Sequence, residues 1–572
     1  MSRFTKPVVV VIVLLLFFPF ITKTYSQELK DAIKLSKSEQ FKKASSMFKY
    51  LIQQTPSNGD LYYFYGRNFL DKYYSDTLNI SLSEMADSAK AVYELGIQQD
   101  PANPLNLVGL GGLDLIKKKI PEAQAEFAKA MALLPSKANK QLKMDPAKHS
   151  RVLIEIAESY VTANVHDTAN VFVLLHQAEK LDSKNPNLYI VKGDVYFYLL
   201  NDGSKAISNY NEAQRLDPKS PEAKLRIGQL WMRARNYTDA LSYYQEVVKM
   251  DSTFAPAYRE LGYLLSRANR NAEAQKNYKK FLALSTGNTS ARITFVNILL
   301  DLKNYFEAIY QLNLIMNVDS SENTLNRALA YSYYEVQLYD KGLYYIQKFI
   351  KNAKPEKILS LDYSYYGKLL TKNKQDSLAA EMYLKAYDMD QSKVDLLSEL
   401  AASYYKQKKY KKSIEIFSKK IALGKASSQD YYTMGKAYFN DKDYINADTT
   451  LGTVITLQPE NLAAILYRAR TKSYMDSVDV QKGTNFTGYA VPFYKLYIEK
   501  SQADSAKYIK ERSEALDYMA FYYYCQYSLN PKSLTDAENA LKYWTLMTAL
   551  NPNEEKALKV KPVIELLKLK LK

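Results

Sequence analysis

The strongest constraint on the fold is a pattern of small and aromatic residues that repeats every 34 positions. Residues 221–288 contain this pattern twice: Gly228, Trp231, Ala240 and Tyr244 are followed by Gly262, Leu265, Ala274 and Tyr278. A small residue in each half of the period lets two helices approach closely, and the aromatic residues fill the space around that contact. One such helix hairpin cannot bury its apolar face alone, so the pattern predicts neighbouring hairpins stacked in an array.

Related motifs extend over nearly the whole chain. They are strong over residues 186–460 and weaker at 60–102, 149–184 and 462–552, with about fourteen motifs in all. Lys354-Pro355 adds three residues to the period, after which Gly367, Ala401 and Gly435 resume the 34-residue step. A polar stretch at 136–148 interrupts the register, and we expect an inserted loop at 476–488. Only 18 glycines and 18 prolines occur in 572 residues, too few for a fold of strands and turns.

The pattern resembles that of the tetratricopeptide-repeat family, and the resemblance covers nearly all of the chain after residue 26. It implies an all-α fold, an α-solenoid of about fourteen helix hairpins that form a right-handed superhelix. We therefore predict N-terminal repeats at 27–136, a linker or long loop at 137–148, a central array at 149–461 and degenerate repeats with insertions at 462–553. Residues 554–572 carry an apolar stripe typical of a capping helix: Val560, Val563, Ile564, Leu567 and Leu571.

The first 26 residues are typical of a secretory signal peptide. Arg3 and Lys6 precede an apolar run at 8–21, and small residues at 24 and 26 precede a cleavage site. The run has 14 residues, fewer than the roughly 20 that a membrane-spanning helix needs. We expect the mature chain to begin at Gln27 in the periplasm of a Gram-negative bacterium. The alternative is an uncleaved N-terminal segment that anchors the chain in the membrane.

The residues that catalysis or metal binding would need are sparse. None of the three histidines, His149, His166 and His176, lies three or four positions from another, as a helical metal site requires. The single cysteine, Cys525, excludes an intrachain disulfide. The phosphate-binding motif GxxxxGK[ST] and the nucleophile motif GxSxG are both absent. We therefore expect no enzyme activity, no cofactor, no metal site and no small-molecule substrate.

A basic surface beside aromatic rings favours an acidic partner. The net charge is +17, of which residues 1–26 contribute three charges. Family resemblance implies that certain positions of each first helix face a ligand groove. On this chain they include Arg259, Tyr263, Arg267, Arg327, Tyr331, Tyr334, Lys368, Lys372, Tyr405, Lys406, Tyr432, Lys436, Phe439 and Arg470. Such residues suit an extended peptide with carboxylates, through charge-assisted hydrogen bonds.

These observations predict a non-enzymatic scaffold of the cell envelope that binds a protein or an extended peptide and organises a multiprotein complex. The alternative is a peripheral binder of anionic lipid or glycan at the envelope surface, acting through residues 554–572 and the groove. Single-stranded nucleic acid would also suit basic and aromatic residues. The export signal argues against that partner, because the periplasm holds little nucleic acid.

Overall fold

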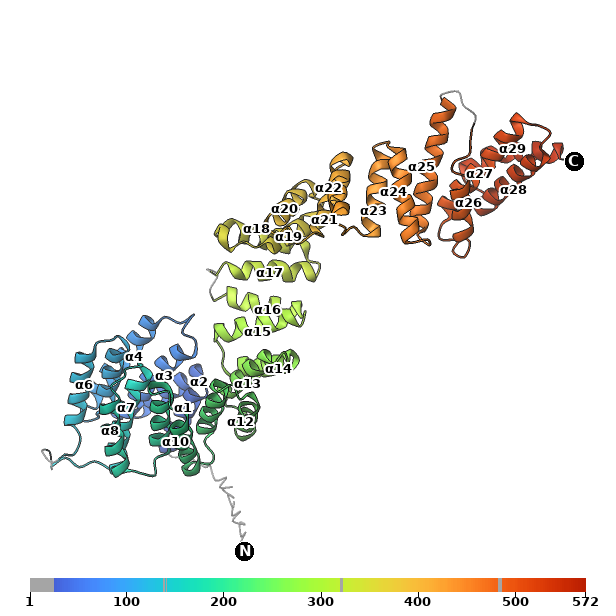
Figure 1. Cartoon of the computed structure of the whole chain (residues 1–572). Coiled ribbons are helices and arrows are strands. Elements are labelled where there is room, and N and C mark those ends of the chain that lie inside the picture. Colours follow the sequence, from blue (N-terminus) through green and yellow to red (C-terminus); the bar gives the residue numbers. More distant parts are fainter. Residues whose placement is uncertain (1–24, 137–138, 140, 319–321, 482–485, 572) are drawn as a thin grey trace, which may run out of the picture. The chain divides into compact units, whose positions relative to one another are not determined.

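The structure is a computed structural model that describes residues 25–136, 139, 141–318, 322–481 and 486–571. These residues form 29 α-helices and no strand, which confirms the predicted all-α class (Figure 1). Consecutive helices pair into fourteen hairpins, and a single helix follows the last of them. The predicted solenoid of about fourteen hairpins is thus confirmed, whereas its right-handed twist stays a prediction. Most of the predicted signal peptide, residues 1–24, lies outside the described residues.

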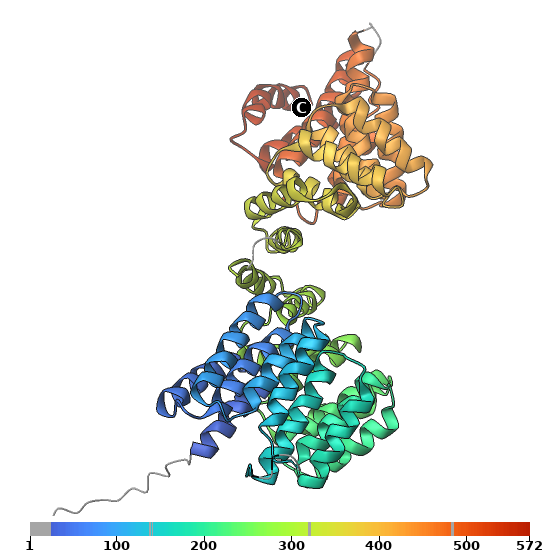
Figure 2. The same cartoon turned by 90° about the vertical axis from the view of Figure 1, so that its left-hand side faces the viewer.

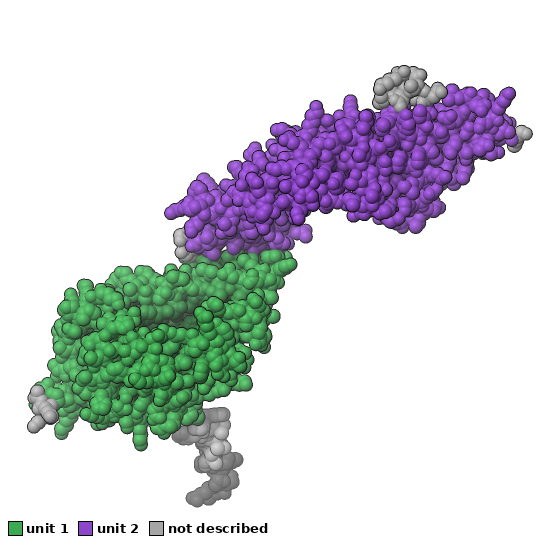
Figure 3. Space-filling model, viewed as in Figure 1, with its two compact units in different colours: residues 1–318 green, residues 319–572 purple. Residues whose placement is uncertain are grey.

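The chain divides into two compact units between Val318 and Asp319 (Figure 3). This boundary lies inside the central array predicted at 149–461. The stretch predicted as a linker, 137–148, lies within unit 1, where residues 137, 138 and 140 are outside the described part. None of the described helices is long and apolar enough to cross a membrane.

Unit 1 contains the first eight hairpins. Its helices are α1 (Tyr25–Lys37), α2 (Phe41–Gln54), α3 (Gly59–Ser75), α4 (Leu82–Gln99), α5 (Leu105–Ile116), α6 (Ile120–Ala132), α7 (Pro146–Thr162), α8 (Thr168–Leu181), α9 (Pro186–Asp194), α10 (Gly203–Leu216), α11 (Pro221–Arg233), α12 (Tyr237–Met250), α13 (Ala255–Arg267), α14 (Asn271–Leu284), α15 (Thr289–Asp301) and α16 (Tyr305–Met316). A π-helical segment, η1 (Val195–Leu199), continues α9.

Unit 2 contains six hairpins and the last helix. Its helices are α17 (Thr324–Glu335), α18 (Tyr339–Asn352), α19 (Ser360–Lys372), α20 (Asp376–Met389), α21 (Leu396–Lys406), α22 (Tyr410–Ala422), α23 (Ser428–Asn440), α24 (Tyr444–Leu457), α25 (Leu462–Gln481), α26 (Val491–Lys500), α27 (Ile509–Leu529), α28 (Leu534–Leu550) and α29 (Glu555–Lys570). A short 3-10 turn, η2 (Pro355–Lys357), precedes α19.

The insertion predicted at 476–488 begins later than expected, because α25 continues as a helix to Gln481. Asp476, on this helix, is fully buried and holds the returning chain. Its carboxylate accepts hydrogen bonds from Thr487 Oγ1 at 2.7 Å and from the backbone N–H of Tyr489 at 3.0 Å. The predicted loop therefore starts inside a helix, and residues 482–485 lie outside the described part.

Close packing inside the hairpins follows the 34-residue pattern. Tyr244 is fully buried beside Gly228, and a Cβ added at Gly228 would lie 2.5 Å from Tyr244 Cε1. The same relation joins Gly262 to Tyr278, with a distance of 2.8 Å to Cδ2. Glycine is needed on these first helices because a tyrosine ring from the second helix occupies the space of the missing side chain.

The turns inside the hairpins confirm the register. Eleven non-glycine residues of the described chain have a positive φ, between 50° and 66°. From Asn201 to Gln337 they recur every 34 residues, and the next, Lys374, follows after 37. The longer step matches the three residues that Lys354-Pro355 adds. The full set is Glu39, Lys118, Asn164, Asn201, Arg235, Asn269, Lys303, Gln337, Lys374, Lys408 and Lys442.

Unit 1 closes on itself, because its first two hairpins contact its later ones (Figure 1, Figure 2). Lys34 and Lys37 of α1 pair with Asp251 at 2.8 Å and with Glu222 at 2.6 Å. Asp76, which follows α3, accepts a hydrogen bond at 2.6 Å from the backbone N–H of Thr289, the first residue of α15. A carboxylate at this position also satisfies the positive end of the α15 dipole. Unit 1 is therefore a closed array.

Candidate functional site

The fourteen residues predicted to line a groove all lie on first helices of hairpins. Arg259, Tyr263 and Arg267 lie on α13 in unit 1. The other eleven lie in unit 2: Arg327, Tyr331 and Tyr334 on α17, Lys368 and Lys372 on α19, Tyr405 and Lys406 on α21, Tyr432, Lys436 and Phe439 on α23, and Arg470 on α25. Their role in binding a partner stays a prediction. Their contacts divide the cations among them into those that pair with a carboxylate of the chain and those that do not.

The first aromatic cluster joins α17 to α19. The rings of Tyr331 and Tyr365 stack with centroids 4.0 Å apart, and Tyr334 meets Tyr365 edge-on at 5.4 Å. Lys368 Nζ lies 5.3 Å from the centroid of the Tyr365 ring. One turn further along α19, Lys372 Nζ lies 5.5 Å from the ring of Tyr339. Each ammonium group is thus held over an aromatic face by cation–π attraction.

The second aromatic cluster joins α21, α23 and α25. Lys436 Nζ lies 4.6 Å from the ring centroid of Tyr432 and 5.2 Å from that of Tyr405. Tyr467 lies edge-on to Tyr432, at 5.8 Å, and to Phe439, at 5.9 Å. Burial lowers the pKa of Lys436, because the half-buried ammonium group is partly removed from water.

Four of the eight predicted cations are paired with a carboxylate of the chain itself. The guanidinium of Arg327 forms two hydrogen bonds to Asp362, at 2.8 and 2.9 Å, and that of Arg470 forms two to Glu514. The other two paired cations are Arg259, with Glu39, and Lys406, with Asp376 at 3.5 Å. Such pairs hold neighbouring helices together and leave little charge for a ligand.

The other four cations have no carboxylate within ion-pairing distance among the described residues. Arg267 donates a hydrogen bond to the hydroxyl of Tyr263 at 3.2 Å. The remaining three are Lys368, Lys372 and Lys436, all in unit 2 and all placed over tyrosine rings. We refer to these three as the unpaired lysines.

A cleft of about 1030 Å³ adjoins one of the unpaired lysines. Lys368 lines it together with apolar side chains from the start of α19, from the residues just before it and from the end of α20. Leu359, Leu361 and Met389 are each about half exposed there, at 51%, 50% and 50%. The cleft thus offers apolar contacts beside an ammonium group.

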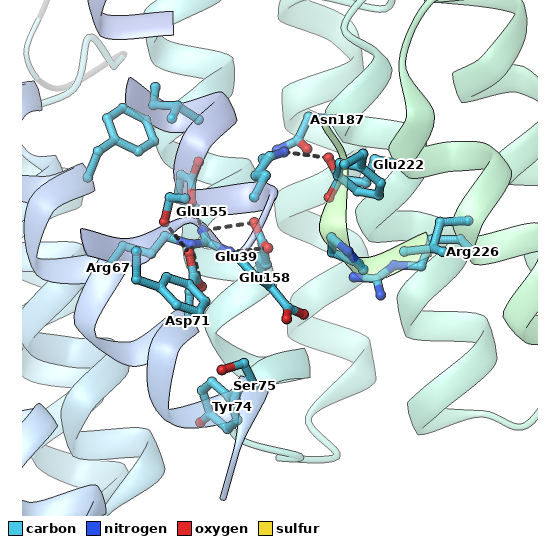
Figure 4. A pocket seen from close by; sticks show the side chains of 18 of the residues that line it. Glu39, Arg67, Asp71, Tyr74, Ser75, Glu155, Glu158, Asn187, Glu222 and Arg226 are labelled. Atoms are coloured by element: carbon cyan, nitrogen blue, oxygen red, sulfur yellow. Dashed lines mark hydrogen bonds and ion pairs between the residues drawn. The ribbon is translucent and has the colours of Figure 1, made fainter. Parts of the chain in front are cut away.

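Sequence reasoning missed a cavity of about 450 Å³ inside unit 1 (Figure 4). Arg67 on α3 pairs there with Glu155 and Glu158 on α7, and Tyr63 donates a hydrogen bond to Glu155 at 2.7 Å. One signal was present, since Glu155 interrupts the apolar run at 152–156 and would therefore be buried. Carboxylates are common in charged helices, however, and the closure that gathers these residues cannot be seen in the sequence.

Two segments match the family profile for the tetratricopeptide repeat. They are residues 192–253 in unit 1 and residues 431–461 in unit 2. No curated protein matches the chain.

Several solved structures of repeat proteins are similar to parts of the chain. The C-terminal part of a tetratricopeptide-repeat protein from Cytophaga hutchinsonii is 29% identical, covers 46% of this chain and 98% of its own, and has a TM-score of 0.40. YrrB, described as a repeat protein with an unusual peptide-binding site, is 16% identical, covering 33% of this chain and 95% of its own, with a TM-score of 0.30. A tetratricopeptide-repeat protein from Parabacteroides merdae is 18% identical over 45% of this chain and 99% of its own, with a TM-score of 0.28.

Proposed function

The chain is a tetratricopeptide-repeat protein, a class of protein-interaction scaffold, and we propose that its unit 2 captures an extended acidic segment of a partner protein in the cell envelope. The observation that carries this proposal is the placement of the unpaired lysines. Lys368, Lys372 and Lys436 are held over tyrosine rings but have no carboxylate partner among the described residues.

An ammonium group in this position is prepared for an anion. Lys368 and Lys436 are half-buried, so part of the cost of removing their water has already been met in folding. A carboxylate of the partner would then form a charge-assisted hydrogen bond with each lysine. The tyrosine rings beside them lose little conformational freedom on binding and offer flat apolar contact area.

The cleft beside Lys368 adds apolar contacts to this recognition. Its exposed Leu359, Leu361 and Met389 would bury side chains of the bound segment. Asp390, Asp395 and Glu399 also line the cleft, as do Lys393 and Lys425, so an acidic segment must place its carboxylates toward the lysines. Unit 2 therefore suits a segment that alternates acidic and apolar residues.

The envelope location rests on residues 1–26, whose basic start and 14-residue apolar run are typical of an export signal. Neither of the two family matches indicates a catalytic family. We therefore propose that the chain organises a multiprotein complex in the periplasm without acting on its partners chemically.

The test is an affinity pull-down from cell-envelope extract with residues 27–572 as bait. The variant Lys368→Gln, Lys372→Gln, Lys436→Gln removes the three unpaired charges. A matched control, Lys351→Gln, Lys411→Gln, Lys561→Gln, removes three exposed lysines that form no ion pair or cation–π pair among the described residues. We expect the first variant to lose a discrete protein partner and the control to retain it. Equal capture by both variants would exclude the unpaired lysines from the interaction.

The second candidate function is peripheral contact with anionic lipid through α29. This helix carries lysines beside three exposed leucines, Leu558, Leu566 and Leu569, which are 51%, 48% and 70% exposed. A basic helix with an exposed apolar edge is typical of membrane-surface binding. Co-sedimentation with anionic vesicles tests it, since Leu566→Ser with Leu569→Ser should abolish binding if α29 inserts at the lipid surface.

A further inference from the structure

The cavity of unit 1 is enclosed by first helices that lie far apart in the sequence. Its charged lining comes from α1 and the turn after it, and from α3, α7, α11 and α13 (Figure 4). A volume of about 450 Å³ falls within the range of roughly 300–1,000 Å³ that is usual for small-ligand sites. The cavity exists only because unit 1 closes, and it is distinct from the unpaired lysines of unit 2.

Most charges that line the cavity are matched one to one. Lys37 pairs with Glu222 at 2.6 Å, Arg226 with Asp194 at 3.1 Å, and Arg259 with Glu39. Arg151 lies 3.5 Å from Asp60. Lys37 lies near enough for its charge to favour the ionised forms of Asp71, Glu155 and Glu158, but its ion pair is with Glu222.

Around Arg67 the charges are not matched. This single guanidinium faces three carboxylates: Glu155, Glu158 and Asp71, the last at 3.8 Å. Figure 4 shows the four side chains gathered on one side of the cavity. When all three carboxylates are ionised, the cluster holds an excess of two negative charges in a buried place.

The chain stabilises these three carboxylates unequally: the charge of Arg67 outweighs burial and lowers the pKa of Glu158, whereas the pKa values of Glu155 and Asp71 are raised. Burial raises the pKa of Glu155, which is 4% exposed, despite the nearby charge of Arg67. Burial raises the pKa of Asp71 as well, and the charge of Glu158 adds to that effect. Glu39, which also lines the cavity, is 9% exposed, and its Oε2 has no hydrogen-bond partner among the described residues. A positively charged occupant would stabilise the ionised forms of Glu155, Asp71 and Glu39.

The apolar lining of the cavity combines aromatic rings with aliphatic side chains such as Ile33, Ile154 and Leu225. The rings include those of Phe41, Phe64, Phe254 and Tyr74. Aromatic faces attract organic cations and pack against apolar stems, but they offer no ligand to a bare metal ion. No group of three acidic, histidine or cysteine side chains among the described residues is arranged to hold a metal.

We propose that the cavity of unit 1 binds an organic cation, an ammonium or guanidinium group on an apolar stem, between the carboxylates of Asp71, Glu155 and Glu158 and the aromatic rings of the lining. The cation would be that of a free amine or of a basic side chain on a bound peptide. Both sources present the same chemistry to the cavity.

Isothermal titration calorimetry on the full chain tests this site with three probes. They are pentylamine, pentanol as its neutral counterpart, and N-acetyl-lysine amide as a peptide side chain. We expect the two amines to bind and pentanol not to bind. Tighter binding of pentylamine identifies a free amine as the source, and tighter binding of the lysine derivative identifies a peptide.

Two variants connect the binding to the carboxylates. Asp71→Asn keeps the hydrogen bond that Ser36 Oγ donates at 3.2 Å but removes one negative charge, so amine affinity should fall at least about tenfold. Glu158→Gln should lower amine affinity by a similar factor. With two variants, the conclusion does not depend on the correct folding of either one alone. The control Asp87→Asn removes an exposed carboxylate and should leave affinity unchanged. Absence of amine binding, equal binding of pentanol, or full affinity in both variants would overturn the proposal.

Discussion

Arg259 on α13 forms an ion pair with Glu39, which lies in the turn between α1 and α2, 220 residues earlier in the chain. Glu39 is 9% exposed, and burial raises the pKa of its carboxyl even though Arg259 lies beside it. The guanidinium also lies 5.7 Å from the ring centroid of Phe281. Arg259 was predicted to face a ligand, and the structure shows that its charge contributes to the closure of unit 1.

Replacing Arg259 with alanine should loosen the first hairpin of unit 1. The change leaves Glu39 buried without its counter-charge, and breaking such a pair from one side costs about 3–5 kcal/mol. Hydrogen exchange of the α1 and α2 amides should therefore become faster than in the parent chain. Arg270→Ala, which removes an exposed pair with Glu273 inside α14, is the control and should leave exchange unchanged. Unaltered exchange in Arg259→Ala would mean that other contacts hold the closure.

The hairpins could be predicted because their contacts are local and periodic. Gly228 and Tyr244 lie 16 positions apart, and the same pair recurs as Gly262 and Tyr278. A short spacing that recurs can be recognised in one sequence. The extent of α25 could not be predicted, since Asp476 anchors a returning chain through contacts that occur once.

The contacts that form the two candidate sites do not recur with the period of the sequence. Lys37 meets Glu222 only because eight hairpins curve back on themselves, and the cavity follows from that curvature. Similarly, nothing in the sequence distinguishes Arg327, which is neutralised by Asp362, from Lys436, which has no carboxylate partner among the described residues. Positions on a helix face could be predicted, but the charges left for a ligand could not.

Gly228→Ala should destabilise unit 1 although alanine favours helices. The new Cβ would lie 2.5 Å from Cε1 of Tyr244, whose fully buried ring would have to shift. We expect the free energy of unfolding to fall by about 1–3 kcal/mol. Trp231, on the same helix, reports this transition by fluorescence in a Trp544→Phe background. Gly203→Ala places its Cβ where no atom lies within 4 Å, so it should be neutral or slightly stabilising.

Asp194 should make the stability of unit 1 depend on pH. Burial raises its pKa from 3.8 to about 6, an effect that outweighs the charge of Arg226. Because the pKa of Asp194 is higher in the folded chain than in the unfolded one, its protonated carboxyl stabilises unit 1 below about pH 4. This stabilisation is lost as the pH rises through about 6. The loss amounts to about 3 kcal/mol.

The test is to measure urea unfolding between about pH 4 and pH 7 for the parent chain and for Asp194→Asn. Asparagine still accepts the hydrogen bond from Tyr210 but does not titrate. As the pH rises across this range, the parent chain should therefore lose unfolding free energy relative to Asp194→Asn. A constant difference would show that Asp194 is not the titrating group. Asp87→Asn, at a carboxylate that is 69% exposed, serves as the control.

The last helix, α29, has two leucines in contrasting places, and they separate its structural role from a membrane role. Leu567 is 1% exposed and packs in one cluster with Trp544 of α28, whereas Leu569 is 70% exposed. Leu567→Ala should lower the stability of the C-terminal hairpin by about 2–5 kcal/mol, as a buried leucine truncation does. Trp544 fluorescence in a Trp231→Phe background follows that transition. Leu569→Ala should leave this unfolding transition unchanged. If Leu569→Ala alone loses vesicle binding, the exposed edge of α29 contacts lipid.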